Sequence, residues 1–335
     1  MTTERPPEVE PFLRGAPFPA AGDVAYPRAD PKDTRLPQDT WTMACVPATV
    51  RLELVAEGAE AVEIGYRTAT DQLGYRGEGA GTTFALWQGD DPVDERPAVL
   101  GEGTVRLGLV GSGEPAVVYL PEGMRPTILS VTGVGCDVAP APAGPRWVAY
   151  GDSILEGWVA TGPARCWPAV TARSLGLDVV NLGYAGAARG EMASAEQVAA
   201  LPADVISVSH GTNCWTRTPH SAGMMRETTA AFLEVVRGGH PTTPIVVPSP
   251  VLRPDAEATP NRLGATLVDL RAAMEEAVQA RIDAGDRALT LVPGGDVLTA
   301  DHLPDGIHPG DEGHELLAEV FGGAVGAALG RGTGR

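Results

Sequence analysis

The sequence predicts an all-β sandwich followed by an α/β unit whose parallel sheet is covered by helices on both faces. Three observations support this fold class. The first 138 residues contain short apolar segments at close intervals, a Pro-rich stretch follows, and from residue 147 onward apolar segments alternate with helical ones. Short strands separated by turns are typical of an antiparallel sandwich. Strands that alternate with helices indicate a parallel sheet.

Six segments in residues 1–138 are expected to be strands of the sandwich. The first, TVRLELVAE, alternates between apolar side chains on one face and Arg51 and Glu53 on the other. The others are AVEIGYRTA, TTFALWQ, TVRLGLVG, AVVYLP and PTILSVTGV, separated by Gly, Pro and Asp clusters. Residues 1 to about 35 are rich in proline and are expected to form an irregular lead-in to this domain.

Residues 139–146, within the stretch VAPAPAGPR, are expected to be a semi-rigid linker, because this composition suits neither a strand ladder nor a helix. In residues 147–335, buried parallel strands are predicted for WVAY, DVVNLG, DVISVS, PIVVPS and ALTLVP. Helices are predicted between these strands, and a last helix is predicted for DEGHELLAEVFGGAVGAAL. Because ligands of such sheets bind at the carboxyl ends of the strands, the functional site is expected at that edge.

The composition limits the classes of partner. With 43 acidic and 25 basic residues the chain has a net charge of −18, which disfavours nucleic acid and anionic membranes. Small anionic ligands are not excluded, because salt screens charge over about 8 Å.

The N-terminus has no apolar signal-peptide core, and no later stretch reaches the ~18 apolar residues of a membrane span, so a cytoplasmic location is expected. The four cysteines form no CxxC pair and are expected to be buried thiols. Nothing in the sequence indicates an oligomeric state.

Four polar motifs follow the predicted strands. They are the GDS of RWVAYGDSILEGW, the first glycine of NLGYAG, the GTN of HGTNCW and the segment LPDGIHPGDEGH. A serine hydroxyl such as that of Ser153 attacks well only when a base takes its proton, and histidine is suited to this task. His308 is the candidate base, and Asp305, three residues before it, is the candidate carboxylate that orients the histidine. We expect Asp152 to stabilise the turn rather than to serve as this carboxylate.

The developing negative charge of an acyl-transfer intermediate needs hydrogen-bond donors aimed at it. The candidates are the N–H groups of Ser153 and Gly183 and the side-chain amide of Asn213. A glycine at position 183 lets the backbone approach a substrate closely. The motifs therefore predict a serine-dependent acyl-transfer site.

These motifs resemble, in order and approximate spacing, the four sequence blocks of the SGNH (GDSL-type) hydrolases over residues 147 to about 325. The resemblance implies a three-layer α/β/α, flavodoxin-like fold. It also implies Ser153 as nucleophile, His308 as base and Asp305 as the orienting acid. In the same way it assigns Gly183 and Asn213 to the oxyanion hole.

The chain departs from the family pattern in two places. Ile154 stands where the older motif name has leucine, and Trp215 follows the third block, where many members carry an acidic or small residue. Trp215 and Trp158 are candidate residues of the substrate pocket, and His210 is expected to be a structural residue at a strand end that also lines the pocket. No metal is expected, because the histidine-rich tail lacks the i, i+4 spacing of zinc helices and a triad explains His308.

The N-terminal part resembles the carbohydrate-binding-module-like β-domain of a two-domain SGNH subgroup common in actinomycetes. That subgroup includes esterases and an acyltransferase that modifies a tetracycline-type natural product, and related architectures occur in carbohydrate deacetylases. The short linker leaves this domain little freedom. We therefore expect it to form part of the wall of the active-site pocket.

The reaction that the sequence favours is hydrolysis of an O-acyl ester of a small molecule or glycoside through an acyl-Ser153 intermediate. The alternative is an O-acyltransferase that moves an acyl group to a hydroxyl of a natural product, with acyl-CoA or another activated donor. No other cofactor is expected. A third alternative is a non-catalytic glycan-binding protein, against which the four motifs argue.

Overall fold

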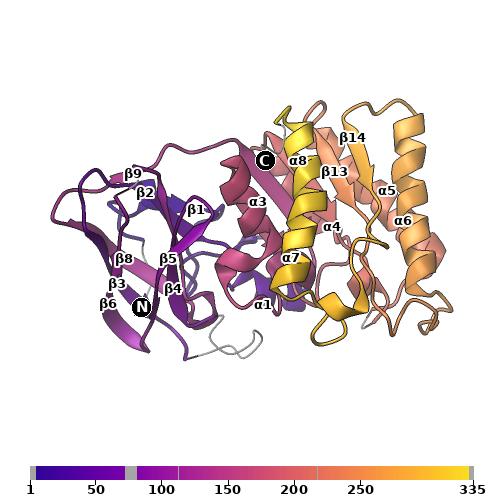
Figure 1. Cartoon of the computed structure of the whole chain (residues 1–335). Coiled ribbons are helices and arrows are strands. Elements are labelled where there is room, and N and C mark those ends of the chain that lie inside the picture. The colour runs from indigo at the N-terminus through magenta and orange to yellow at the C-terminus, as the bar shows by residue number, and fades with distance from the viewer. Residues whose placement is uncertain (1–4, 72–80, 112, 217, 332–335) are drawn as a thin grey trace.

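The computed structural model of the chain describes residues 5–71, 81–111, 113–216 and 218–331. Figure 1 shows a β-rich N-terminal part in indigo to magenta beside an α/β part in magenta to yellow. The N-terminal part also contains α1 (Gln38–Ala44) and short 3-10 turns at Glu10–Phe12 and Glu122–Met124. Its strands are β1 (Leu13–Arg14), β2 (Arg51–Val55), β3 (Ala61–Thr68), β4 (Thr83–Gln88), β5 (Asp91–Pro97), β6 (Gly101–Gly108), β7 (Ala116–Tyr119), β8 (Pro126–Val134) and β9 (Ala139–Pro140).

The N-terminal strands form two antiparallel sheets. One has the order β1-β2-β7-β4-β5, with β9 paired to β2, and the other has the order β6-β3-β8. Apolar side chains from both sheets share one core, which includes Leu52, Ile64, Phe84, Leu107, Val118 and Ile128. The predicted antiparallel β-rich region is confirmed, and all six predicted segments contain strands.

Two N-terminal features differ from the prediction. Strand β5, with the sequence DPVDERP, was not expected because its prolines and charges disfavour strands; it pairs with β4 only and lies at the sheet edge, where such residues are tolerated. In the predicted linker, Ala139 and Pro140 pair with β2, so this stretch does form a short ladder. Proline can take an edge position, since no N–H is needed on the open side.

The α/β part contains a five-stranded parallel sheet in the order β11-β10-β12-β13-β14. Its strands are β10 (Arg146–Gly151), β11 (Asp178–Gly183), β12 (Val205–Ser209), β13 (Ile245–Pro248) and β14 (Leu289–Val292). Numbered along the chain, the order is 2-1-3-4-5, which is the doubly wound order of flavodoxin-like folds. The predicted α/β/α fold is confirmed.

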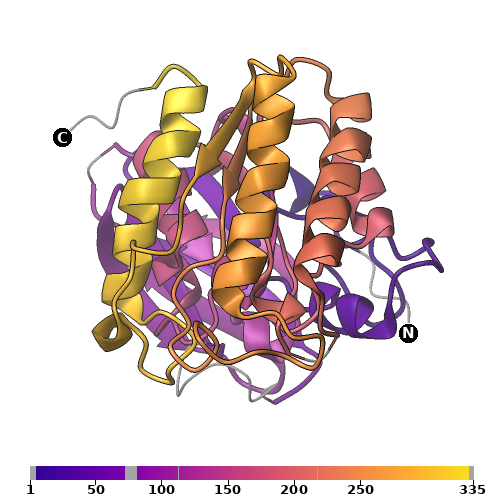
Figure 2. The same ribbon diagram turned by 90° about the vertical axis from the view of Figure 1, so that its right-hand side faces the viewer.

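Helices cover both faces of this sheet. They are α2 (Ser153–Glu156), α3 (Trp167–Leu175), α4 (Met192–Ala200), α5 (Ala222–Gly239), α6 (Leu267–Asp283), α7 (Asp311–Leu317) and α8 (Gly323–Ala328). Short 3-10 turns lie at Pro163–Arg165, Thr212–Cys214 and Ala300–His302, and a π turn at Ala318–Gly322 joins α7 to α8. Helices α4, α5 and α6 share one core with the sheet, and α2, α3, α7 and α8 share another. Figure 2 looks onto this part, with the orange and yellow helices in front.

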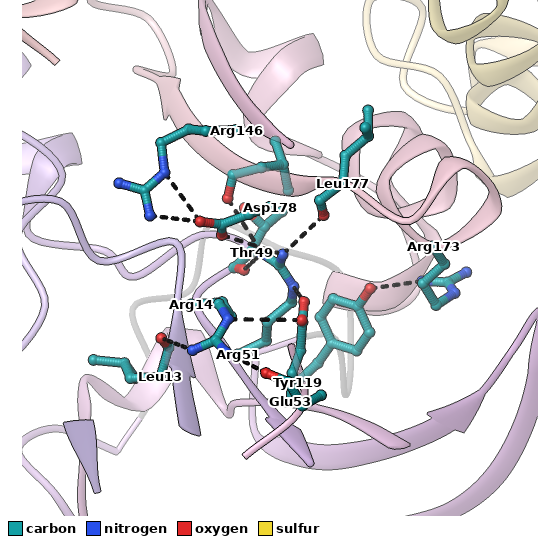
Figure 3. A network of polar contacts seen from close by, with 12 residues as sticks. Leu13, Arg14, Thr49, Arg51, Glu53, Tyr119, Arg146, Arg173, Leu177 and Asp178 are labelled. Atoms are coloured by element: carbon teal, nitrogen blue, oxygen red, sulfur yellow. Dashed lines mark hydrogen bonds and ion pairs between the residues drawn. The ribbon is translucent and has the colours of Figure 1, made fainter. Parts of the chain in front are cut away.

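A buried polar network joins the two parts (Figure 3). Arg51 of β2 is 1% exposed and donates hydrogen bonds to the carbonyl oxygens of Leu177 and Val179, each at 3.2 Å. Its Nη2 also lies 3.6 Å from Asp178 Oδ1. The other carboxylate oxygen, Asp178 Oδ2, accepts two hydrogen bonds from Arg146, at 3.0 and 2.6 Å. The face of β2 that carries Arg51 is therefore covered by the α/β part.

Two composition-based expectations concern the cysteines and membrane spans. Cys45, Cys166 and Cys214 are buried free thiols, as expected, whereas Cys136 is exposed in the turn after β8. Within the described ranges, no helix combines the length and the apolar composition that a membrane span requires.

Candidate active site

Ser153 lies at the carboxyl end of β10, the strand between β11 and β12. Asp152 is the N-cap of α2, and its Oδ1 accepts the Ile154 N–H at 3.1 Å. Such a cap starts a helix directly after an extended residue. Gly157 ends the helix after one turn with φ +93°, a conformation that favours glycine. This strand–turn–helix unit presents Ser153 at the strand edge, with Asp152 in the structural role predicted for it.

His308 connects Ser153 to Asp305. Its Nε2 lies 2.8 Å from Ser153 Oγ, and its Nδ1 lies 2.6 Å from Asp305 Oδ2. The other carboxylate oxygen, Oδ1, accepts the backbone N–H groups of Ile307 and His308 at 2.9 and 2.7 Å. Gly306, with φ +79°, allows the tight turn that brings these groups together. The three predicted side chains thus form a continuous hydrogen-bonded chain.

The two carboxyl groups near Ser153 have opposite pKa shifts. Partial burial acts to raise the pKa of Asp305, but hydrogen bonds from the His308 ring and from two backbone N–H groups outweigh it, and the pKa is lowered. Burial raises the pKa of Asp152, despite hydrogen bonds from Ile154 and Thr212. A carboxylate that orients a histidine must be ionised, and this favours Asp305 over Asp152 for that role.

Asn213 lies in the 3-10 turn after β12 and is 7% exposed. Its Nδ2 donates one hydrogen bond, to Ala188 O at 3.2 Å. Among the described residues no second acceptor contacts this amide nitrogen, so one of its two hydrogens is available to a substrate oxygen. The backbone N–H of Ser153, at the start of α2, is likewise without an acceptor in the described part of the chain. Both groups are suited to bind an oxyanion.

The structure contradicts the donor role predicted for Gly183. Its N–H donates to the side chain of Asn181, Oδ1, at 2.8 Å and is not available to a substrate. A Cβ at position 183 would lie 2.6 Å from Glu156 N, so glycine is needed here for the close packing of α2 on β11. The glycine of this motif therefore has a packing role.

The next glycine of the same motif, Gly186, was missed. It has φ +68°, and its N–H has no acceptor among the described residues. The adjacent Ala185 N–H binds Glu156 of α2 at 2.7 Å, and Ala188 O binds Asn213. Gly186 thus lies in a loop held between the helix of Ser153 and Asn213. The sequence signal for this donor is the second glycine of NLGYAG, which follows Gly183 by three residues.

Of the three predicted pocket residues, Trp158 is beside the candidate triad. Its ring centroid lies 5.9 Å from that of His308, with 42° between the planes. Trp215, two residues after Asn213, donates from Nε1 to Thr259 O at 2.8 Å, and the Arg253 guanidinium lies 4.9 Å from its ring centroid. Trp215 is thus held by the segment that follows β13.

His210 is not a pocket residue. It is 1% exposed, and its ring lies 5.9 Å from both Tyr150 and Phe232. Burial lowers its pKa to about 3, with a smaller contribution from the charge of His220. An imidazole in this environment stays neutral at ordinary pH. The burial agrees with the prediction of a structural residue at a strand end and contradicts its placement in the pocket.

Two charged residues near the site were also missed. Arg28, from the lead-in, and Glu156, at the end of α2, are both 0% exposed and lie 3.6 Å apart. No sequence signal identifies the pair, because its partners lie far apart along the chain. No group of three or more His, Cys, Asp or Glu side chains within the described ranges is arranged to hold a metal ion.

Comparison with known proteins identifies one family and several solved structures with a similar fold. Residues 149–316 match the model of the GDSL-like Lipase/Acylhydrolase family. No curated protein sequence matches the chain. The fold is similar to that of "Salicylyl-Acyltransferase SsfX3 from a Tetracycline Biosynthetic Pathway", with a TM-score of 0.79, 24% identity, and coverage of 95% of this chain and 94% of that chain.

Two further solved structures are similar. One is a protein of Bacteroides ovatus described as GDSL-like lipase, with a TM-score of 0.78, 22% identity, and coverage of 95% of this chain and 96% of that chain. The other is a family two carbohydrate esterase from Clostridium thermocellum in complex with cellohexaose, with a TM-score of 0.60, 16% identity, and coverage of 84% and 92%. At these identities the similarities establish a shared fold that includes the N-terminal part.

Proposed function

Because the chain belongs to the GDSL-like Lipase/Acylhydrolase family, we propose that it is an esterase that hydrolyses an O-acyl ester through an acyl-Ser153 intermediate. The observation that carries this proposal is the chain of hydrogen bonds from Asp305 through His308 to Ser153 Oγ, at 2.6 and 2.8 Å. A carboxylate, an imidazole and a hydroxyl in this order activate the hydroxyl as a nucleophile.

In the first half of the reaction, Ser153 Oγ attacks the carbonyl carbon of the ester while its proton passes to His308 Nε2. The carbonyl π electrons move onto oxygen and form a tetrahedral oxyanion. Asp305 stabilises the imidazolium and keeps Nδ1 protonated. The oxyanion then collapses, the C–O bond to the alcohol breaks, and the alcohol leaves with the proton from Nε2. The product is the acyl-Ser153 ester.

In the second half, a water molecule attacks the acyl carbon as His308 Nε2 takes a proton from it. Collapse of this second intermediate breaks the bond to Ser153 Oγ, which regains its proton from the histidine. The free acid leaves and the enzyme returns to its starting state. Each transfer uses His308 once as base and once as acid.

We assign the oxyanion hole to the Ser153 N–H, the Asn213 amide and the Gly186 N–H, with Gly186 in place of Gly183. The support is that the Ser153 and Gly186 N–H groups have no acceptor among the described residues, and that Asn213 Nδ2 keeps one hydrogen beside the one bound to Ala188 O. The Gly183 N–H, by contrast, is bound to Asn181. Donors that are fixed before the reaction stabilise the oxyanion without the cost of reorganisation.

Trp158 and Trp215 are proposed to border the acyl or alcohol side of the substrate, and the N-terminal domain, residues 1–138, is proposed to form a further wall. A cavity of about 430 Å³ lies between β4, β5 and residues 161–165, and its lining includes Trp87, Val93, Thr161 and Arg165 but none of Ser153, His308, Trp158 and Trp215. Thr161 binds Asp311, three residues after His308, through hydrogen bonds of 2.8 and 2.6 Å. The substrate is accordingly proposed to be a small-molecule or glycoside ester.

The second candidate function is an O-acyltransferase, in which a substrate hydroxyl replaces water in the second half-reaction. The similarity to an acyltransferase fold over both parts of the chain is consistent with this candidate. The triad chemistry is the same, and the acceptor decides between the two. Product analysis with an ester donor and a polyol, sugar or phenolic acceptor separates them: free acid alone supports the esterase, and acylated acceptor supports the transferase.

The proposed activity is tested with p-nitrophenyl acetate and butyrate. We expect the wild-type protein to release p-nitrophenol and Ser153→Ala to lose at least about 10³-fold in kcat, as triad serines do. Ser249→Ala is a matched control, because Ser249 also lies just after a strand of the parallel sheet and its hydroxyl donates to a carboxylate, Glu275 Oε1, at 2.6 Å. It should keep wild-type kcat. Equal rates for wild type and Ser153→Ala would exclude the mechanism.

A further inference from the structure

Arg28 of the lead-in is a buried charge that reaches into the α/β part of the chain. Its side chain is 0% exposed and donates to Asn181 O at 2.9 Å and to Gly183 O, at the end of β11. It also donates to Met43 O of α1, at 2.8 Å, and to Val46 O, just after that helix. The guanidinium therefore binds the carboxyl end of β11, the strand that leads into the Gly186 loop.

The same guanidinium faces Glu156, the last residue of the Ser153 helix. Arg28 Nη2 lies 3.6 Å from Glu156 Oε2, and that oxygen accepts the Ala185 N–H at 2.7 Å. Glu156 thus links α2, which begins with Ser153, to the loop that contains Gly186. Both charges are fully buried, where Coulomb attraction is strong but desolvation is costly.

Two further contacts fix the position of the lead-in on this loop. The Tyr184 hydroxyl donates to Arg28 O at 2.8 Å, and the Arg28 guanidinium lies 5.4 Å from the Tyr184 ring centroid. Arg189 binds Asp39 of α1 at 2.9 Å and Gly186 O at 3.1 Å. The lead-in and α1 together therefore contact both ends of the segment from Gly183 to Arg189.

We propose that Arg28 is a positioning residue for the reaction: through Glu156 and Gly183 O it holds the Ser153 helix and the Gly186 loop in the relative orientation that the oxyanion requires. The inference rests on the function proposed above and extends it to the N-terminal segment. A buried ion pair is weak evidence for stability alone, since apolar residues of similar volume often serve as well. Its contacts with the helix and the strand end that carry two of the three proposed donors account for a charge at this point, because small displacements of such donors are costly in rate.

Arg51 provides a matched control, because it makes similar buried contacts but lies away from the candidate site. Arg51 is also a buried arginine from the N-terminal part, it also binds two carbonyl oxygens at β11, and it also faces a carboxylate, Asp178. It binds at the start of β11, however, at the end of the sheet opposite Ser153. Removing either arginine removes similar contacts, but only Arg28 adjoins the candidate site.

The experiment compares Arg28→Met and Arg51→Met in the full chain by Tm, by kcat and KM for p-nitrophenyl acetate, and by the rate of inactivation with a fluorophosphonate. We expect both variants to lower Tm by several degrees. Arg28→Met should lower kcat and the inactivation rate about 10- to 100-fold with KM within about 3-fold, as a displacement near 1 Å does. Arg51→Met should keep kcat within about 3-fold.

If Arg28→Met does not fold, Arg28→Lys is used, which keeps a positive charge opposite Glu156 but loses the forked hydrogen bonds to Asn181 O and Gly183 O. It should also lower kcat, by about 3- to 10-fold, at unchanged KM. The inference is overturned if the Arg28 variants keep wild-type kcat or lose no more than Arg51→Met. Failure of the proposed function has a different signature, namely undiminished turnover by Ser153→Ala.

Discussion

His308 Nε2 lies 2.8 Å from Ser153 Oγ, although 155 residues separate the two along the chain. The contact follows from the sheet order. Ser153 begins α2, two residues after the end of β10, and β10 has a neighbouring strand on each side. The segment after β14 returns across the carboxyl edge with Asp305 and His308 before α7 begins. The parallel sheet therefore brings together the first and last of the sequence motifs at one edge.

Asp305→Asn should lower kcat about 10²- to 10⁴-fold, because an amide can stabilise the wrong tautomer of His308 and no longer stabilises the imidazolium. The side chain of Asp305 is 39% exposed, so Tm should change little. Steady-state kinetics with p-nitrophenyl acetate, together with a thermal melt, measure both effects. Activity within 3-fold of wild type would remove Asp305 from the triad.

Asn213→Ala should lower kcat by about 10²- to 10³-fold with little change in KM, because an oxyanion donor acts in the transition state. Asn261→Ala provides a control, since Asn261 also binds a backbone carbonyl, His220 O, at 2.9 Å. The control should keep wild-type kcat. If the two variants have equal kcat, the Asn213 amide is not an oxyanion donor.

His210 should make the protein lose stability as the pH falls. Its pKa is about 3 in the folded state, against an ordinary value near 6.5, so between these values the unfolded chain binds more protons. Stability then rises with pH in this window and is lost on acidification, by about 1 kcal/mol for each pH unit. Urea unfolding at pH 4, 5, 6 and 7 should give a flatter profile for His210→Phe, whose ring suits the position between Tyr150 and Phe232. Parallel profiles would show that His210 is not buried as a neutral ring.

The two parts of the chain should unfold as one cooperative unit. Arg51, Asp178 and Arg146 form a buried network across their contact, and Arg28 adds a second one. Differential scanning calorimetry should therefore give a single transition with equal calorimetric and van't Hoff enthalpies. Two resolved transitions would mean that the parts are thermodynamically independent.

Much of the architecture could be predicted because it depends on local patterns. Alternating and continuous apolar segments identified six N-terminal strands and all five strands of the parallel sheet. Ser153, Asp305 and His308 could be identified as candidates because each lies in a short motif, the first directly after a strand and the other two in the segment before α7. Strand β5 could not, since DPVDERP lacks a strand pattern and is held by its pairing with β4.

The errors concern residues whose role depends on contacts distant in sequence. Gly183 was predicted to be an oxyanion donor, but its N–H donates to the side chain of Asn181. His210 looked like a strand-end polar residue near the pocket, but its neighbours are Tyr150 and Phe232. Arg28 lay in a segment expected to be an irregular lead-in, and its partners lie 153 and 155 residues away.

The central claim is that Ser153 is the nucleophile, and active-site labelling tests it most directly. The protein is treated with a fluorophosphonate, which phosphonylates activated serines, and is then examined by intact mass and peptide mapping. We predict one adduct per chain, located on Ser153, loss of esterase activity in proportion to labelling, and no adduct on Ser153→Ala. An adduct on another residue, or inactivation without modification of Ser153, would contradict the account.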